Sequence, residues 1–352
     1  MVNDIASRIG AFLESASPGR SMHSAPGIAL GSVKGPVRKE NQDRVAAAFV
    51  QSPQTGEFLV AVLCDGMGGM VEGGAAATIA ASEFLATLIL SRARVSPDIL
   101  MRAAEKANSA VFERLEGAGG STLTAIVVHN HAQAWAIHIG DSRLYSFGAE
   151  RSLTLLTRDD TIEGLALGHN RYDEDVLDSR LLQYVGIGDD LHPNIVTIPY
   201  PFDEKFILTS DGAHSLGRKV IELVCRNTAN SSEWVRRINF MSEATGAEDN
   251  ASIIALAPDE FVPPRSMANQ LTIRLYSAMS ELEIWALYPD HLQSPQSPVP
   301  KNEPQDTDHK NSGPIKEQTG RQRRARRTKT GKNAAPKPQL MIKFGDRDVD
   351  GE

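Results

Sequence analysis

Three apolar segments that follow one another with almost no chain between them place the strongest constraint on the fold. They cover residues 121–129, 134–140 and 143–147, are rich in β-prone side chains and are joined by tight turns. A parallel crossover needs about a dozen or more residues, so consecutive strands with such short connections must pair antiparallel. The sequence therefore predicts an antiparallel sheet at the centre of the chain.

Helical patterns flank this run of strands on both sides. Alanine, isoleucine and leucine recur every three or four residues in the two long patterns before it, and two shorter patterns and one more strand follow it. This order predicts an α+β fold in which an antiparallel β-sandwich is flanked by helix pairs. The helical patterns cover 75–92, 97–115, 217–227 and 233–243, and the last strand covers 251–257.

The stretch 58–74, FLVAVLCDGMGGMVEGG, joins an apolar strand directly to a carboxylate and a cluster of glycines. Asp65 stands where the strand leaves the sheet. Residues without a Cβ, such as Gly66, let the backbone turn sharply and bring its carbonyl groups close to a bound ion or phosphate. Taken alone, the stretch is also typical of a strand, a turn and the start of a helix.

Three further aspartates share the context of Asp65. Asp141 in IHIGDSRLY and Asp211 in FILTSDGAHS each end an apolar run, and Asp249 in AEDNASIIAL begins one. One antiparallel core could therefore place all four at the same end. Clustered carboxylates repel one another unless cations neutralise them, and oxygen ligands without paired His or Cys select hard ions such as Mg²⁺ or Mn²⁺. A single Asp-Gly is more typical of a turn, but four acids in one setting predict a metal site.

A polar turn between two expected strands is a second candidate site element. Residues 34–44, KGPVRKENQDR, contain Gly and Pro and hold Arg38, Asn41 and Asp43 within a few positions. Loops carried by rigid strands are where binding and catalytic groups are commonly found.

Charge and cysteine usage limit the class of protein. Residues 1–290 contain 24 Lys and Arg against 36 Asp and Glu, whereas 291–352 contain 13 against 8. An acidic body disfavours binding along a nucleic-acid duplex and suits divalent cations. Two cysteines, Cys64 and Cys225, imply no disulfide framework and favour a reducing, cytoplasmic location. With no apolar run of membrane length and no leader pattern, we expect no membrane partner, and an amphipathic helix within 1–17 should cap the core.

The chain divides into a domain at 1–260, an extension of undetermined structure at 261–290 that adds a strand or a helix, and a disordered basic tail at 291–352. Residues 321–332 contain seven bases and no acid. This run is a solvated linker, or it binds an acidic partner, nucleic acid or a kinase. The short apolar patch 340–344 could dock as a peptide.

Seven motifs in family order resemble those of the metal-dependent serine/threonine protein phosphatases of the 2C (PPM) type, in their bacterial-like form. They lie within 28–256 and read GPVRKENQD, DGMGG, GSTLTAIVV, IGDSRLY, LTRDD, LTSDG and EDN. The resemblance implies a PPM-type αββα fold with a metal site in a cleft at one end. It also implies hydrolysis of phosphoserine and phosphothreonine in phosphoprotein substrates by a two-metal-activated water, in opposition to a cognate Ser/Thr kinase.

The resemblance assigns metal ligands by motif position, for two Mn²⁺ or Mg²⁺ ions and a third found in bacterial-type members. Asp65 would bridge both ions, and the carbonyl of Gly66 would bind one of them. Asp211 and Asp249 would hold the other ion. Asp141, together with Asp211, would form the weaker third metal site.

The resemblance also implies that Arg38 grips the substrate phosphate and that Asp43 orients the metal-bound water. Three positions depart from the family pattern. Gln42 replaces a common Glu, Met67 replaces a His that protonates the leaving oxygen in some relatives, and Asp160 replaces a His beside the flap. A thioether cannot donate a proton, so another group must serve at that step.

The flap would cover residues 159–194 and include a charged helix at 172–180 that selects substrates. Two alternatives to an active phosphatase remain open at this point. Gln42 favours a low-activity regulatory protein with the phosphatase fold, and the basic tail favours an interaction scaffold.

Overall fold

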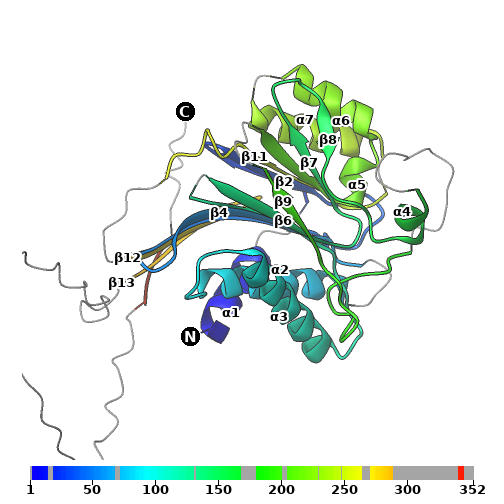
Figure 1. The fold of residues 1–352 in the computed structure, drawn as a ribbon. Helices are drawn as coiled ribbons and strands as arrows, with labels where there is room; N and C mark the ends of the chain where they lie inside the picture. Colours follow the sequence, from blue (N-terminus) through cyan, green and yellow to red (C-terminus); the bar gives the residue numbers. More distant parts are fainter. Residues whose placement is uncertain are drawn as a thin grey trace, which may run out of the picture.

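A computed structural model of the protein describes residues 2–14, 19–67, 72–130, 132–167, 180–199, 204–228, 230–246, 248–263, 270–287 and 340–344. Two antiparallel sheets are stacked face to face in these ranges, and helices cover the outer face of each sheet (Figure 1). The α+β sandwich flanked by helices that the sequence predicts is therefore confirmed.

The first sheet has six strands in the order β1-β2-β11-β10-β7-β8, and every neighbouring pair is antiparallel. The strands that end near one another at the site are β7, β10 and β11. The bounds are β1 Ser21–Ala25, β2 Ile28–Val33, β7 Arg143–Phe147, β8 Leu153–Leu155, β10 Lys205–Thr209 and β11 Ala251–Leu256.

The second sheet has eight strands in the order β14-β13-β12-β3-β4-β5-β6-β9, again antiparallel throughout. Its middle strands are buried on both faces, because helices cover one side and the first sheet covers the other. The bounds are β3 Arg44–Ser52, β4 Gly56–Cys64, β5 Leu123–His129, β6 Gln133–Ile139, β9 Asn194–Ile198, β12 Gln270–Ser277, β13 Glu281–Leu287 and β14 Leu340–Phe344.

The run of three consecutive strands forms as expected, but its third member does not pair with the second. β5 and β6 form a hairpin, whereas β7 crosses to the other sheet and pairs with β8 and β10. Gly140 has a φ of +106°, a conformation that residues with a Cβ rarely adopt, and it turns the chain at this point. The expectation that every tight turn joins paired strands was therefore wrong here, because a short turn can also change sheets.

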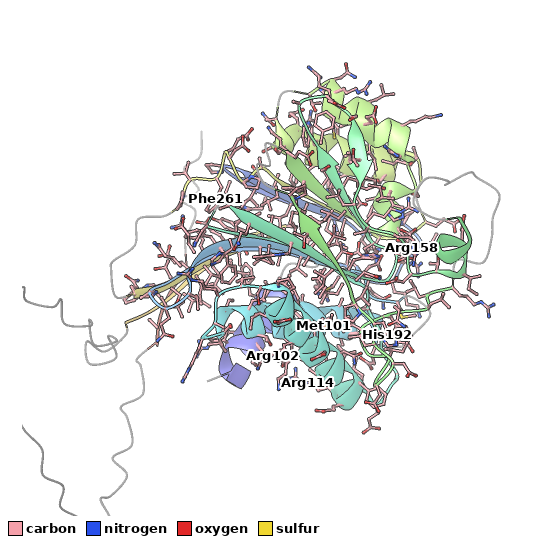
Figure 2. All side chains as sticks on the ribbon, viewed as in Figure 1. Met101, Arg102, Arg114, Arg158, His192 and Phe261 are labelled. Atoms are coloured by element: carbon pink, nitrogen blue, oxygen red, sulfur yellow. The ribbon has the colours of Figure 1, made fainter. Side chains whose placement is uncertain are left out.

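Helices α1, α2 and α3 cover the eight-stranded sheet, and α6 and α7 cover the six-stranded one (Figure 1). The expected N-terminal helix caps the core, since Ile5 and Ile9 are buried in the same cluster as Phe84 of α2. The charged side chains Arg102 and Arg114 of α3 are exposed at its outer surface (Figure 2). The helices are α1 Val2–Glu14, α2 Gly73–Ile89, α3 Pro97–Leu115, α4 Ile162–Leu167, α5 Asp211–His214, α6 Arg218–Arg226 and α7 Ser231–Ala244.

The region beyond residue 260 contributes to the second sheet. The extension at 261–290 contains β12 and β13, which continue the sheet past β3, and the apolar patch 340–344 forms β14. The remainder of the expected tail lies outside the described residues, as does the expected flap helix apart from Arg180. Both cysteines are free and buried. None of the helices described has the length and apolar character that a membrane crossing requires.

Candidate functional site

The four predicted aspartates line one cavity of about 420 Å³. Asp65 follows β4, and Asp141 lies in the crossing between β6 and β7. Asp211 follows β10, and Asp249 precedes β11. The cavity is therefore built where strand ends of both sheets meet, and the structure brings together acids that are far apart in the sequence.

Hydrogen bonds around Thr122 hold the part of the cavity that belongs to the second sheet. The backbone N–H of Asp65 donates to Oγ1 of Thr122 at 2.9 Å, and the backbone N–H of Thr122 donates to the carbonyl of Asp65 at 2.9 Å. The same hydroxyl lies 2.8 Å from Oγ of Ser142. These contacts fasten the end of β4 to the crossing that carries Asp141, so both carboxylates have defined positions.

The turn after Asp65 requires a glycine. A Cβ on Gly66 would lie 2.3 Å from the carbonyl oxygen of Gly73 and 2.9 Å from that of Gln42, so no larger residue fits. The backbone N–H of Gly66 donates to the carbonyl of Gln42 at 3.3 Å. The side-chain amide of Gln42 donates to Glu40 at 3.0 Å, and Gln42 does not line the cavity.

Arg38 lies beside the carboxylates of the first sheet. Its guanidinium donates to Oδ2 of Asp249, and it is partly exposed, with 34% of the side chain accessible. The other oxygen of Asp249 accepts the backbone N–H of Asn250 at 2.7 Å. Oδ1 of Asp211 likewise accepts the N–H of Gly212 at 2.5 Å. Each of these two acids is thus held by the backbone N–H of the following residue.

Asp43 is buried beneath the cavity, with 4% of its surface exposed. Burial raises the pKa of Asp43 to about 6, and the nearby hydroxyls of Ser252 and Ser210 oppose that rise. Neither hydroxyl makes a hydrogen bond of good geometry, because both carboxylate oxygens of Asp43 have no partner. The buried guanidinium of Arg44 donates to the carbonyls of Asn41 and Asp43 at 2.8 and 2.9 Å, which fixes the backbone of this turn.

The acids of the cavity raise the pKa values of one another. Burial, followed by the charges of Asp43 and Asp211, raises the pKa of Asp65 well above its usual range. Burial, followed by the charge of Asp211, raises the pKa of Asp141 to about 7. Burial and the charge of Asp249 raise the pKa of Asp211. Negative charge at this site is therefore costly in the protein alone.

The donor set fits hard divalent cations by its chemistry. Across the described part of the chain, no three His, Cys, Asp or Glu side chains converge as a ready-formed group of metal ligands. The carboxylates instead surround one cavity, and Asp43 below it has two buried oxygens without partners. Oxygen donors that are buried, mutually repelling and short of hydrogen bonds are the type of environment that Mg²⁺ or Mn²⁺ neutralises.

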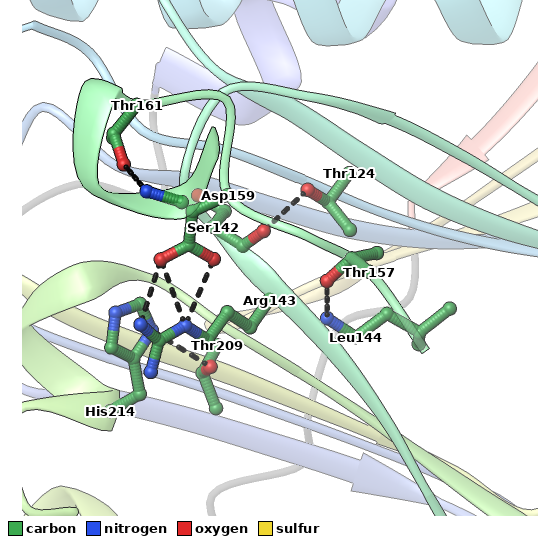
Figure 3. A network of polar contacts seen from close by, with 10 residues as sticks. Thr124, Ser142, Arg143, Leu144, Thr157, Asp159, Thr161, Thr209 and His214 are labelled. Atoms are coloured by element: carbon green, nitrogen blue, oxygen red, sulfur yellow. Dashed lines mark hydrogen bonds and ion pairs between the residues drawn. The ribbon is translucent and has the colours of Figure 1, made fainter. Parts of the chain in front are cut away.

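Three residues of the cavity were not singled out by sequence reasoning. Arg143 forms a two-pronged ion pair with Asp159, donating from Nε at 3.0 and 3.2 Å and from Nη2 at 2.7 Å (Figure 3). His214 lies next to this pair, with Nδ1 at 3.3 Å from Oγ1 of Thr209. Burial and the charge of Arg143 keep the pKa of His214 well below its usual value. Arg143 and Asp159 do stand in the motifs IGDSRLY and LTRDD, but their spacing gives no sign that they meet.

Asp160 and Met67 have different relations to the cavity. Met67 lines it, whereas Asp160 does not. Oδ2 of Asp160 accepts the N–H of Gly140 at 3.0 Å, and Oδ1 accepts the side-chain N–H of Asn194 at 3.0 Å. The backbone carbonyl of Asp160 accepts the N–H of Leu182 at 2.7 Å. Asp160 therefore fastens both ends of the expected flap to the crossing between the sheets.

No protein-family model matches the sequence, and no curated protein sequence matches it. Solved structures match in fold. The PPM Ser-Thr phosphatase MsPP from Mycobacterium smegmatis, solved with cacodylate, has 25% identity and a TM-score of 0.56, and the match covers 67% of this chain and 98% of that one. Stp1 from Staphylococcus aureus has 17% identity and a TM-score of 0.56, covering 67% and 96%. The catalytic domain of the phosphatase PstP with two manganese ions has 24% identity and a TM-score of 0.53, covering 67% and 97%.

Proposed function

Because the chain has the fold of bacterial PPM-type Ser/Thr phosphatases, we propose that it hydrolyses phosphoserine and phosphothreonine in proteins, with divalent metal ions, and opposes a Ser/Thr kinase. The observation that carries this proposal is the single cavity lined by Asp65, Asp141, Asp211 and Asp249. Buried acids that raise the pKa values of one another destabilise a fold unless cations neutralise them. A phosphatase that depends on metal ions needs such a cavity.

The ligand roles follow the positions of these residues. Asp65 and the carbonyl of Gly66 would hold one ion, Asp65, Asp211 and Asp249 would hold the other, and Asp141 with Asp211 would hold a third. The preferred ions would be Mn²⁺ or Mg²⁺, since all donors are oxygens. When bound, the ions would supply a water of lowered pKa and neutralise charge during attack on phosphorus.

Arg38 would bind the substrate phosphate at the mouth of the cavity. Its planar guanidinium matches two phosphate oxygens, and its partly exposed position leaves it within reach of a protein substrate. The contact with Asp249 occupies the same guanidinium, so substrate would compete with that carboxylate for it.

Two other residues would set the course of proton transfer. Asp43 has two unpartnered oxygens that can accept a hydrogen bond from the attacking water and hold its orientation. Met67 lines the cavity but has no proton to give to the leaving oxygen. Solvent would therefore protonate the leaving group of the serine or threonine.

A phosphopeptide assay tests the proposal. The purified chain should release phosphate from a phosphothreonine peptide with Mn²⁺, and EDTA should abolish the release. Asp211→Ala should lower kcat/KM by about 1,000-fold or more, in the range of losses seen when a group that stabilises charge in the transition state is removed. Asp259→Ala, at an exposed aspartate outside the cavity, should leave the rate unchanged. Release that persists in EDTA would refute the proposal.

Binding without turnover would favour the low-activity regulatory hypothesis instead. If the wild type binds the phosphopeptide with Mn²⁺ and releases no phosphate, the site recognises phosphate but is not catalytic. Arg38→Ala should then abolish binding. In an active enzyme the same substitution should raise KM and lower kcat. Opposition to a kinase would show as phosphosites that rise in occupancy when the gene is deleted.

A further inference from the structure

The eight-stranded sheet ends in a strand that comes from far along the chain. β14 pairs antiparallel with β13 from Ala286↔Leu340 to Leu282↔Phe344, and residues 288–339 join the two strands. Without β14, β13 would be the edge of the sheet and would expose a row of unpaired N–H and C=O groups. Such an edge is a template for pairing with any extended chain of suitable pattern.

The apolar residues of β14 continue rows that cross the whole sheet. One row runs through Val50, Ile273, Ile284 and Ile342, and the first three of these residues are at most 1% exposed. Alternate residues of a strand share one face, so the other apolar residues of β14 lie in rows on the same face as Ile342. Those rows are Leu271–Ala286–Leu340 and Leu275–Leu282–Phe344.

The charged residue of β14 also stands at a complementary position. On the opposite face, Nη2 of Arg274 donates to Oε2 of Glu283 at 2.8 Å, and the register places Lys343 opposite Glu283. A slip of one residue would move the apolar positions to the wrong face and remove this match. Both faces therefore favour the same register.

We propose that residues 340–344 are a self-docking strand by which the chain completes its own sheet, closing residues 288–339 into a loop fastened to the phosphatase-like domain at both ends. The seven bases at 321–332 then belong to an anchored loop instead of a free tail. A flexible connection of about 50 residues spans roughly 40 Å on average and gives the strand an effective concentration on the order of millimolar. Intramolecular docking thus outcompetes strands of other molecules at micromolar concentration.

Disulfide trapping tests which chain supplies the strand. In the full-length variant Glu283→Cys with Lys343→Cys, the two thiols would lie opposite each other, and a disulfide within one chain should form at least about tenfold faster than in the control. The control is Thr197→Cys with Lys343→Cys, because Thr197 is exposed on β9 at the other edge of the sheet. The native cysteines should not compete, since burial raises the pKa of both thiols. Equal rates, or a disulfide that joins two chains, would overturn the proposal.

Peptide binding tests whether the edge accepts this sequence pattern. A labelled peptide of residues 336–348 should bind full-length Ile342→Asp, because the charge would expel the native strand from its apolar row. The wild type should bind it at least about tenfold more weakly, because the edge is occupied. Met341→Thr, which changes the other face of the same strand, should behave like the wild type. Binding to none of these proteins, or equal binding to all three, would overturn the proposal.

Discussion

Two carboxylates of the same cavity have opposite electrostatic situations. Asp141 is surrounded by other acids, and burial together with the charge of Asp211 raises its pKa to about 7. Asp159, in contrast, has both oxygens in the ion pair with Arg143. The charge of the first destabilises the metal-free fold, whereas the charge of the second is matched by a buried cation.

Neutralising these two acids should therefore change stability in opposite directions. Between its usual pKa and about 7, the folded state holds a proton on Asp141 that the unfolded state has lost, so stability falls as pH rises through this window. Asp141→Asn should raise the melting temperature of the metal-free protein by several degrees at pH 8 and hardly at pH 4. Asp159→Asn should cost about 3 kcal/mol, because it leaves Arg143 buried without its partner.

Thermal unfolding in EDTA at both pH values measures these effects. A gain for Asp141→Asn that is the same at pH 4 and pH 8 would contradict the assignment of the raised pKa. Asp259→Asn, at an exposed position, serves as the neutral control.

The buried His138 should make the fold sensitive to acid. Burial lowers its pKa, and its Nδ1 lies 2.9 Å from Oγ1 of Thr124. Below about pH 6.5 the unfolded chain takes up a proton that the folded chain does not, so this contribution to stability is present above that pH and is lost as the pH falls. His138→Gln should therefore reduce the difference in unfolding free energy between pH 7.5 and pH 5 in urea titrations. His192→Gln, at an exposed position (Figure 2), should not reduce it.

At the residue scale, the sequence predicts groups that share a local pattern and misses groups that meet only in the fold. The four aspartates were found because each adjoins an apolar strand. The ion pair of Arg143 with Asp159 was not found, because its two residues come together only once β7 has crossed between the sheets. The unpartnered state of Asp43 likewise depends on what surrounds it in three dimensions.

At the scale of single elements, local chemistry determined which predictions succeeded. The bounds of α3 agree with the predicted 97–115, because Pro97 is suited to the first turn and Glu116 and Gly117 adopt positive φ after the last one. The short strands β8 and β9 were not predicted, since few residues define them. The change of sheet at β7 was also missed, because a strand pattern does not say which strand it pairs with.

The glycine turn after β4 should tolerate no side chain. Gly66→Ala would place a Cβ 2.3 Å from the carbonyl oxygen of Gly73, so the turn and the start of α2 would have to shift. We expect a loss of about 2 kcal/mol or more in unfolding free energy and a loss of metal-dependent activity. Gly10→Ala is a matched control within α1, where the nearest atom would lie at an ordinary 3.6 Å. That substitution should stabilise the protein by up to about 1 kcal/mol, since Ala favours helix over Gly.

Chemical denaturation of both variants measures this difference. The expected strain at position 66 would be contradicted if both substitutions left the midpoint unchanged or shifted it in the same direction.

At the scale of the whole molecule, the order of elements predicted the layers but not how far the sheets extend. Strands, a helix pair, more strands and a second helix pair are enough to predict a sandwich with helices outside. The sequence does not show that β12, β13 and β14 lengthen the second sheet beyond β3, because each could pair at several edges. Packing against the neighbouring apolar rows selects one of them.

The cavity lies between the two sheets, so a bound metal should couple them. Asp65 belongs to the end of β4 in one sheet, and Asp211 and Asp249 belong to β10 and β11 in the other. Because the metal binds the folded state, Mn²⁺ at about 100 times its dissociation constant should add about 2.7 kcal/mol to the unfolding free energy. Amide hydrogen exchange should slow at the ends of β4 and β10 together, and should remain unchanged in β12, which is remote from the cavity. Asp211→Ala should lose the protection in both sheets, because removing one ligand releases the ion from the others. Protection that persists at β4 in this variant would show that each sheet binds metal independently.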